Sequence, residues 1–263
     1  MILDCSYRLP GPLATSILLE EGHEIIRIEY QEKRDPFSKS NLKGVRCWYK
    51  KFNDKKKFYS FRPEDLDSFI KRYKKDIQAA IIDSHSPFLS TLKKNSIKHV
   101  VICSTKENKR PMHDLDILAK SGYFDVGSQI PEMPFVGILF AEKIVTEFYK
   151  LLFYQKNEIK VFLDDTLRVL NKVHLPPDQR FFSGKVIGYN DYSLKNGRIF
   201  LTALEQKSWL VFLEYLSLEN PQNVSPVDNV RTQFYETLKK KLSAMTKEDF
   251  LSYDQSKKCF TII

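Results

Sequence analysis

Three polar side chains, His113, Glu142 and Glu205, are of types that can carry proton chemistry. A histidine or a carboxylate held in position can remove and return a proton. His113 precedes Asp114 near a predicted helix start, where a solvated loop histidine is the alternative. Glu205 follows a strand-like segment, and its alternative role is a helix N-terminal carboxylate stabilised by the helix dipole. Glu142 lies in a long helical segment, where a salt-bridged surface residue is the alternative.

The cysteines and the apolar runs indicate the compartment. The four cysteines are scattered without a CxxC spacing, which argues against a disulfide scaffold and a structural zinc site; they are Cys5, Cys47, Cys103 and Cys259. No apolar run reaches the roughly 18 residues of a membrane span. The first nine residues have neither a basic lead nor a long apolar core. We therefore expect a cytoplasmic protein with no signal peptide, membrane span or bound metal.

The positive charge points to an anionic partner. The chain of 263 residues has 42 Lys and Arg against 33 Asp and Glu residues, a net charge of +9. Nucleic acid, an acidic membrane surface and a small phosphorylated ligand all fit such a charge. The basic blocks, Lys55-Lys56-Lys57 among them, lack the interleaved glycines and exposed aromatics typical of nucleic-acid modules. We therefore expect no nucleic-acid partner, although the charge alone keeps a nucleic-acid binder as a third, weaker hypothesis.

The alternation of apolar segments predicts the elements that must position these residues. Residues 2–5 form an expected strand, a helix follows over 13–21, and a second strand covers 24–30. This βαβ unit implies a parallel sheet. Further helices are expected over 63–73, 87–94 and 136–154, and further strands over 79–83, 99–103 and 159–163. The pattern predicts an α/β fold with a Rossmann-like doubly wound parallel sheet over residues 1–172.

The remaining chain predicts a second domain. Residues 175–178 read as a linker because two adjacent prolines disfavour regular structure. Paired strands over 186–192 and 197–203 are expected around an Asn-Gly turn. Helices are expected over 207–216 and 231–244. We therefore predict a smaller α+β domain over residues 173–263.

Three segments, in order, resemble motifs of one enzyme family. Residues 10–29 begin with Pro-Gly-Pro-x-Ala and end with Gly-x-Glu-Ile-Ile-Arg-Ile-Glu. Residues 113–122 read HDLDILAKSG, and residues 189–205 keep two tyrosines, a glycine and a final Ala-Leu-Glu. Together they resemble the class III CoA-transferases, in particular the α-methylacyl-CoA racemase branch. The resemblance implies a Rossmann-like domain that binds acyl-CoA and a homodimer, which we expect the large domains to hold.

The resemblance also implies chemistry at the carbon next to the thioester. Inverting that carbon needs one base on each of its faces. By similarity His113 and Glu205 serve one face. The aspartate expected on the other face, which is the nucleophile of the transferase branch, is replaced by Ile138. Glu142, one helical turn later, is a possible displaced carboxylate. The chain is therefore either an enzyme acting on a CoA thioester or a catalytically silent relative that binds CoA esters or a partner chain.

The resemblance further suggests residues that contact coenzyme A. Pro10 and Gly11 would shape the loop facing CoA, although a tight strand-to-helix connection needs them in either case. Tyr30 stands where the family often has an arginine on the adenine ring. Lys55, Lys56 and Lys57 would meet the CoA phosphates, with a solvated turn as the alternative.

Overall fold

The protein forms two compact units, residues Met1–His174 (unit 1) and Leu175–Ile263 (unit 2). The computed structural model describes residues 1–106, 112–124, 130–173, 184–220, 223–253 and 259–263. The predicted linker over 175–178 lies outside these ranges, as do residues 107–111. Each unit has its own hydrophobic core and is described by itself.

Unit 1 is built on a six-stranded parallel sheet in the order β3-β2-β1-β4-β5-β6. The strands are β1 (Ile2–Cys5), β2 (Ile25–Tyr30), β3 (Lys57–Phe61), β4 (Ala79–Asp83), β5 (His99–Cys103) and β6 (Glu158–Phe162). This is the strand order of a doubly wound Rossmann sheet. The expected α/β fold is confirmed.

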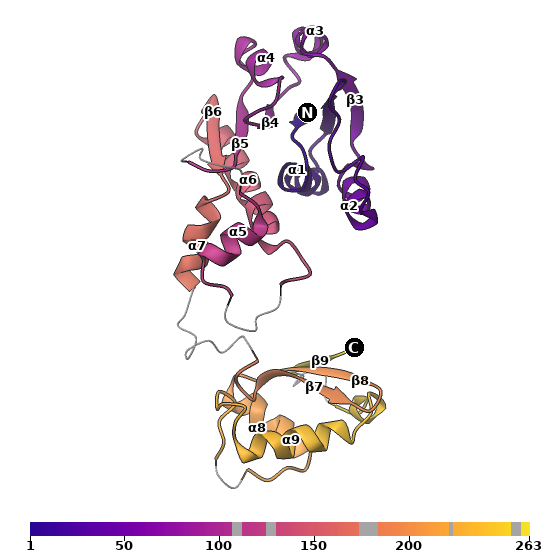
Figure 1. The fold of residues 1–263 in the computed structure, drawn as a ribbon, viewed down its shortest axis with the longest axis vertical. Coiled ribbons are helices and arrows are strands. Elements are labelled where there is room, and N and C mark those ends of the chain that lie inside the picture. Colours follow the sequence, from indigo (N-terminus) through magenta and orange to yellow (C-terminus); the bar gives the residue numbers. More distant parts are fainter. Residues whose placement is uncertain (107–111, 125–129, 174–183, 221–222, 254–258) are drawn as a thin grey trace. The chain divides into compact units, whose positions relative to one another are not determined.

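Helices cover both faces of this sheet (Figure 1). The described helices of unit 1 are α1 (Pro10–Glu20), α2 (Lys43–Asn53), α3 (Pro63–Tyr73), α4 (Leu89–Lys94), α5 (Asp114–Lys120), α6 (Phe135–Phe153) and α7 (Asp165–Val173). Successive strand residues point to opposite faces. Ile2 therefore packs with α1 and α6, while Leu3 packs with α3 and α4. Helix α1 begins three residues earlier than predicted, because proline suits the first helical turn.

In the described part of unit 2, an antiparallel sheet in the order β7-β8-β9 is accompanied by two α-helices and a 3₁₀ helix, Glu248–Phe250. Its elements are β7 (Tyr189–Leu194), β8 (Gly197–Thr202), α8 (Gln206–Tyr215), α9 (Gln233–Ser243) and β9 (Phe260–Ile262). Strands β7 and β8 form the predicted hairpin, but β7 begins three residues later than predicted. Because Leu194 pairs with Gly197, the turn is Lys195-Asn196 rather than Asn196-Gly197. The core centres on Trp209 and Phe212 of α8, both fully buried. Within the described ranges no helix is long and apolar enough to cross a bilayer.

Candidate functional site

The sheet of unit 1 changes direction between β1 and β4, which lie side by side. The chain continues from β1 to β2 on one side and from β4 to β5 on the other. In open α/β sheets, ligands bind outside the carboxyl ends of the strands at such a point. We call this end of unit 1, with residues 6–9 after β1 and Asp83 at the end of β4, the carboxyl edge.

The first turn of α1 lies tightly against the end of β1. A Cβ at Gly11 would lie 2.1 Å from Ser6 Oγ and 2.8 Å from Ile102 Cδ1, so only glycine fits without a shift. Pro10 and Pro12 have no backbone N–H. The helix start therefore lacks two of the N–H donors with which a helix N-terminus binds phosphate. A phosphorylated ligand at this edge needs a cationic side chain instead.

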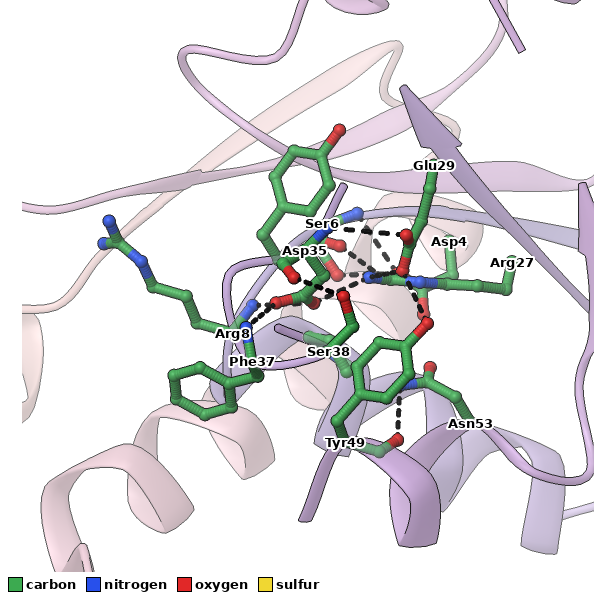
Figure 2. A network of polar contacts seen from close by, with 12 residues as sticks. Asp4, Ser6, Arg8, Arg27, Glu29, Asp35, Phe37, Ser38, Tyr49 and Asn53 are labelled. Carbon is green, nitrogen blue, oxygen red and sulfur yellow. Dashed lines mark hydrogen bonds and ion pairs between the residues drawn. The ribbon is translucent and has the colours of Figure 1, made fainter. Parts of the chain in front are cut away.

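Arg8 provides such a cation. Its backbone has a φ of 66°, a left-handed conformation that is uncommon for a residue with a side chain. The Arg8 N–H donates to Asp35 Oδ2 at 3.0 Å, which holds this conformation. The residue is exposed, and its guanidinium points away from the neighbouring polar network (Figure 2). The sequence analysis did not single out Arg8, because nothing in its neighbours marks the bend.

Asp83 is a second residue that the sequence analysis missed. Its Oδ2 accepts from the Tyr7 N–H at 2.7 Å, and its side chain is half-buried. Burial raises the pKa of Asp83 to about 7, although the Tyr7 N–H and the guanidiniums of Arg27 and Arg8 lower it. A carboxyl that exchanges its proton near neutral pH at a switch point is a candidate acid or base. The sequence did contain a signal for Asp83, because it is the only carboxylate in the strand AAIID.

His113 also lies at the carboxyl edge. It immediately precedes α5 and is exposed, and its backbone N–H donates to Asp116 Oδ2 at 2.9 Å. The adjacent Met112 N–H donates to Ser104 Oγ at 2.8 Å. Because Ser104 directly follows β5, this bond fixes the His113 segment next to the end of that strand.

The start of α6 joins the same edge. Asp114 Oδ1 accepts from the Gly137 N–H at 2.8 Å, and burial raises the pKa of Asp114. A Cβ at Gly137 would lie 3.0 Å from Leu9 Cδ2, so α6 also approaches the residue before α1. The structure thus brings together three segments that the sequence singled out: the turn around Pro10, the His113 segment and the start of α6.

Ile138 is the position where the family resemblance expects a carboxylate. It is half-buried in the second turn of α6, and the first turn has no acidic residue. The carboxylate that binds the start of α6 comes from Asp114 on another element. A side chain that could attack a thioester or carry a proton is therefore missing at position 138.

A buried charged network lies beside this edge, between the sheet and helices α1 and α2 (Figure 2). Arg27 of β2 donates to Asp4 Oδ1 at 3.0 Å and to Asp35 Oδ2 at 2.8 Å. Lys56 donates to Asp4 Oδ2 at 3.0 Å and to Thr15 Oγ1 at 2.7 Å. Each of these charges is compensated within the protein.

The rest of the network connects α2 to strand β2. Glu29 Oε1 accepts from the Tyr49 hydroxyl at 2.9 Å and from Arg27 at 3.3 Å. Burial alone would raise the pKa of Asp4, but Arg27 and Lys56 hold it well below its usual range. Burial lowers the pKa of Lys56 to about 8, against the attraction of Asp4. The network therefore has a structural role: it holds β1, β2 and α2 together next to the carboxyl edge.

The lysines expected to meet CoA phosphates have three different environments. Lys56 is buried, with oxygens of Asp4, Pro12, Thr15 and Asn53 around its ammonium group. Lys55 is exposed in the turn before β3. Lys57 begins β3 and pairs with Glu24 at 2.5 Å. Their contact with a phosphate stays a prediction, and the ammonium of Lys56 is already occupied by protein oxygens.

The remaining predicted residues are Tyr30, Glu142 and Glu205. The Tyr30 hydroxyl donates to Glu32 at 2.6 Å at the end of β2. Glu142 is exposed on α6. Glu205 is exposed at the start of α8 in unit 2, so its pairing with His113 of unit 1 stays a prediction.

Metal ligands and cavities elsewhere in the described residues add little to this site. Among the described residues, no group of three or more His, Cys, Asp or Glu could hold a metal ion. A cavity of about 300 Å³ lies in unit 2 between β7 and α9, lined by Tyr192, Tyr235 and Lys239 among others. Its lining includes Tyr192 of the motif over 189–205 but none of the candidate catalytic or CoA-binding residues.

Comparison with known proteins gives a fold but no close relative. No protein-family model matches the sequence, and no curated protein gives a significant match. A crystal structure of Rv3272 from Mycobacterium tuberculosis is 14% identical with a TM-score of 0.69, over 100% of this chain and 80% of that one. A CAIB/BAIF family protein from Brucella suis is 14% identical with a TM-score of 0.68, over 95% and 79% of the two chains. At such identities, the similarity establishes a shared fold.

Proposed function

We propose that the protein binds a coenzyme A thioester at the carboxyl edge of unit 1, as a member of the class III CoA-transferase family. The observation that carries the proposal is the convergence of the Pro10 turn, the His113 segment and the start of α6 at a topological switch point. The motifs over 10–29, 113–122 and 189–205 and the fold shared with a CAIB/BAIF family protein support the same assignment.

The charges at the carboxyl edge indicate which residue contacts the phosphates of coenzyme A. Coenzyme A carries about four negative charges, which a protein of net charge +9 attracts. The first turn of α1 has two prolines and therefore lacks two of the usual N–H donors. Arg8, exposed beside that turn, is therefore the phosphate contact in this proposal. Removing it should weaken CoA binding about tenfold or more, because a hydrogen bond to a charged group is worth about 1.5–3 kcal/mol.

Thermal unfolding with CoA and acetyl-CoA tests the binding. A ligand that binds the folded state raises the melting temperature. We expect a rise with both ligands, a much smaller rise for Arg8→Ala, and an unchanged rise for Arg72→Ala. Arg72 is a matched control because it is also an exposed arginine. It lies on α3, which packs on the opposite face of the sheet from α1 and α6. No response to millimolar CoA or acetyl-CoA would exclude an acyl-CoA function.

The reaction of the bound thioester depends on which protein side chains can act as bases. His113, paired with Glu205, would remove the proton from one face of the carbon next to the thioester, and Ile138 offers no base to the other face. The protein should then exchange that proton for solvent deuterium while retaining configuration. A catalytically silent CoA-binding protein is the second candidate, and Ile138 is the observation that favours it.

Substitution at 138 separates the two candidates. Ile138→Asp should create or raise inversion of a 2-methylacyl-CoA by about 10²–10⁴-fold, the usual effect of a positioned acid or base. Ile138→Asn is the control of matched size without the charge, and adding His113→Ala should abolish the gain. Absence of both deuterium exchange and rescued inversion would favour the silent protein. Rapid inversion by the natural protein would place the second base elsewhere, with Glu142 first to mutate.

We also infer a homodimer held by unit 1 and a reducing, cytoplasmic setting. All four cysteines are free thiols, and three of them are buried. Free thiols are typical of reducing compartments. This supports the setting, and the dimer rests on the family resemblance.

A further inference from the structure

The positive charge of the chain is concentrated in one short segment. Residues 33–57, which we call the basic segment, contain ten Lys and Arg residues against two aspartates, a net charge of +8. The rest of the chain holds 32 Lys and Arg against 31 Asp and Glu residues and is nearly neutral. Almost the whole net charge of +9 therefore belongs to the loop after β2, helix α2 and the turn that leads into β3.

Most charges of the basic segment lie on the surface and are not neutralised by the protein. Nine of its ten basic side chains are exposed, and Lys56 is the buried one. Of its two carboxylates, Asp35 is buried and only Asp54 is exposed. Among the described residues, Lys57 is the only one of the nine exposed cations with a salt bridge, which it forms with Glu24. The segment therefore presents a strong positive potential to solvent.

Helix α2 arranges four of these cations on one side. Its apolar face is half-buried and comprises Val45, Trp48, Tyr49 and Phe52, at the spacings of three and four residues of an amphipathic helix. This face holds α2 to the protein, because α2 contacts α1 and the Tyr49 hydroxyl donates to Glu29. The remaining surface of α2 is exposed and basic, with Lys43, Arg46, Lys50 and Lys51. Lys43 and Lys50 lie two turns apart, about 11 Å along the helix.

An exposed aromatic ring follows the basic segment on strand β3. Phe58 is in register with Arg27 of β2, so its side chain points to the face of the sheet that α1 and α2 cover. Phe58 is nevertheless 46% exposed. Tyr59 points to the other face, where its ring packs against Phe61 and Phe69. The expectation of no nucleic-acid partner rested on basic blocks without exposed aromatics, and Phe58 removes that ground.

The charge excludes other parts of this protein as the partner. Unit 2 holds 12 Lys and Arg against 10 Asp and Glu residues, so it offers no net negative charge to the basic segment. A second copy of the chain would bring the same cations, and like charges repel. The partner that fits by charge is therefore a separate anion.

The number and placement of the cations select the kind of anion. Nine exposed cations far exceed the about four negative charges of one coenzyme A molecule. Helices that lie on an acidic membrane bury a large apolar face in it. The apolar face of α2 is turned to the protein instead, as the Tyr49 contact shows. A chain of phosphates with unpaired bases fits better, because cations can follow its backbone while an aromatic ring stacks on a base.

We propose that the basic segment and Phe58 form a binding surface for single-stranded nucleic acid, in which the cations of α2 contact phosphates and Phe58 stacks on a base. This inference goes beyond the proposed CoA function and does not depend on it. It uses the exposed cations of α2, none of which is a candidate contact of coenzyme A.

Fluorescence anisotropy with labelled single strands of about 15 thymidines or uridines tests the surface. We expect binding of both, with a slope of log K against log[salt] of about −3 or steeper, since each phosphate contact contributes about −0.7. Substitution of Lys43, Arg46 and Lys50 by glutamine should weaken binding at least tenfold and make the slope shallower by about 2, with unchanged circular dichroism. Absence of binding at low salt would overturn the proposal.

A matched triple variant separates the surface from net charge. Substitution of Arg72, Lys74 and Lys75 by glutamine removes the same three charges from exposed positions at the end of α3. This variant should bind like the natural protein. Equal weakening by the two triple variants would show that only net charge matters and would overturn the assignment to α2.

Phe58 tests the choice of a single strand. Phe58→Ala should weaken binding about fivefold or more, the effect of losing one stacked base, whereas Phe58→Tyr keeps the ring and should retain the affinity. Unchanged affinity of Phe58→Ala would contradict the stacking. Tighter binding to a duplex of the same length, or to vesicles that contain phosphatidylserine, would identify a different partner and overturn the proposal.

The natural Cys47 reports where the oligonucleotide lies. It is exposed on α2 between Lys43 and Lys50, whereas the other three cysteines are buried. A saturating oligonucleotide should slow alkylation of Cys47 by iodoacetamide, a neutral reagent, at least fivefold, as measured by mass spectrometry of the intact chain. Saturating CoA, bound at the carboxyl edge, should leave the rate unchanged. An oligonucleotide that binds without protecting Cys47 would place the site elsewhere and contradict the proposal.

Discussion

Lys55 and Lys56 are adjacent residues with opposite environments. Lys55 is exposed, whereas Lys56 is buried against Asp4. Removing one partner of a buried ion pair leaves a buried charge uncompensated and costs about 3–5 kcal/mol. We expect Lys56→Met to lower the free energy of unfolding by that amount, measured by urea denaturation. Lys55→Met is the matched control and should change it by less than about 0.5 kcal/mol. Equal effects of the two substitutions would contradict the structural role of Lys56.

Asp83 should make stability depend on pH. Its pKa is about 7 in the folded protein, above the usual value near 3.9 for an unfolded aspartate. The protonated carboxyl is therefore favoured by folding, and its contribution is complete below about pH 4 and lost as pH rises towards 7. Because the side chain is only half-buried, we expect a loss of about 1–2 kcal/mol over this range rather than the full shift at about 1.4 kcal/mol per pKa unit.

Asp83→Asn isolates this contribution. Denaturation of both proteins across the same pH range gives a difference in which the other facing groups, Arg8, Arg27, Asp4 and Tyr7, cancel. The natural protein should lose stability relative to the asparagine variant as pH rises. A constant difference between the two proteins would show that Asp83 titrates normally.

The sequence predicted some of these residues better than others. A resemblance singled out His113, and its catalytic role stays a prediction. The charges of β2 were harder, because Arg27 and Glu29 alternate with isoleucine as in a strand with one solvated face. In the protein that face is buried by α1 and α2, and Asp4 and Lys56 from distant segments compensate the charges. Only the tertiary contacts reveal this compensation.

At the scale of elements, burial explains which predictions succeeded. Strands β1, β4 and β5 have the predicted bounds because their continuous apolar runs are typical of a parallel sheet. Strand β3 was missed because it begins with exposed residues at the edge of the sheet. Helix α2 was missed because none of its residues is buried. It contacts α1, and its Tyr49 hydroxyl donates to Glu29 of β2. Weakly apolar elements at an edge carry weak sequence signals.

The junction of β1 and α1 gives a prediction at this scale. Gly11→Ala would place a methyl group against Ser6 Oγ, which is fixed by its bond to Asp4 Oδ1 at 2.6 Å. We expect a loss of about 1–3 kcal/mol, as for other overpacked sites. Gly44→Ala is the control, because Gly44 lies in α2 with no atom within 4 Å of a Cβ. It should be neutral or stabilise by up to about 1 kcal/mol. Chemical denaturation of both variants measures the difference, and a neutral Gly11→Ala would contradict the close packing.

At the scale of the whole molecule, two separate cores imply two folding units. The core of unit 2 contains no residue of unit 1. Each unit also contains one of the two tryptophans, Trp48 in α2 and Trp209 in α8. Trp209 is fully buried and donates to the Val224 carbonyl at 2.9 Å. In a Trp48→Phe protein, fluorescence therefore reports the unfolding of unit 2 alone, while circular dichroism reports both units.

The two ligands should affect these two signals differently. We expect CoA, which has no acyl group, to raise the melting temperature of unit 1 and to leave the Trp209 transition unchanged, since the proposed phosphate contact lies in unit 1. If Glu205 pairs with His113 as proposed, a 2-methylacyl-CoA should raise both transitions. Glu205→Gln should then reduce the response of the Trp209 transition and leave that of unit 1. If the acyl ligand shifts only unit 1, Glu205 has no part in the site, and His113 acts without a partner from unit 2. A single transition seen by both methods would show instead that the two cores unfold together.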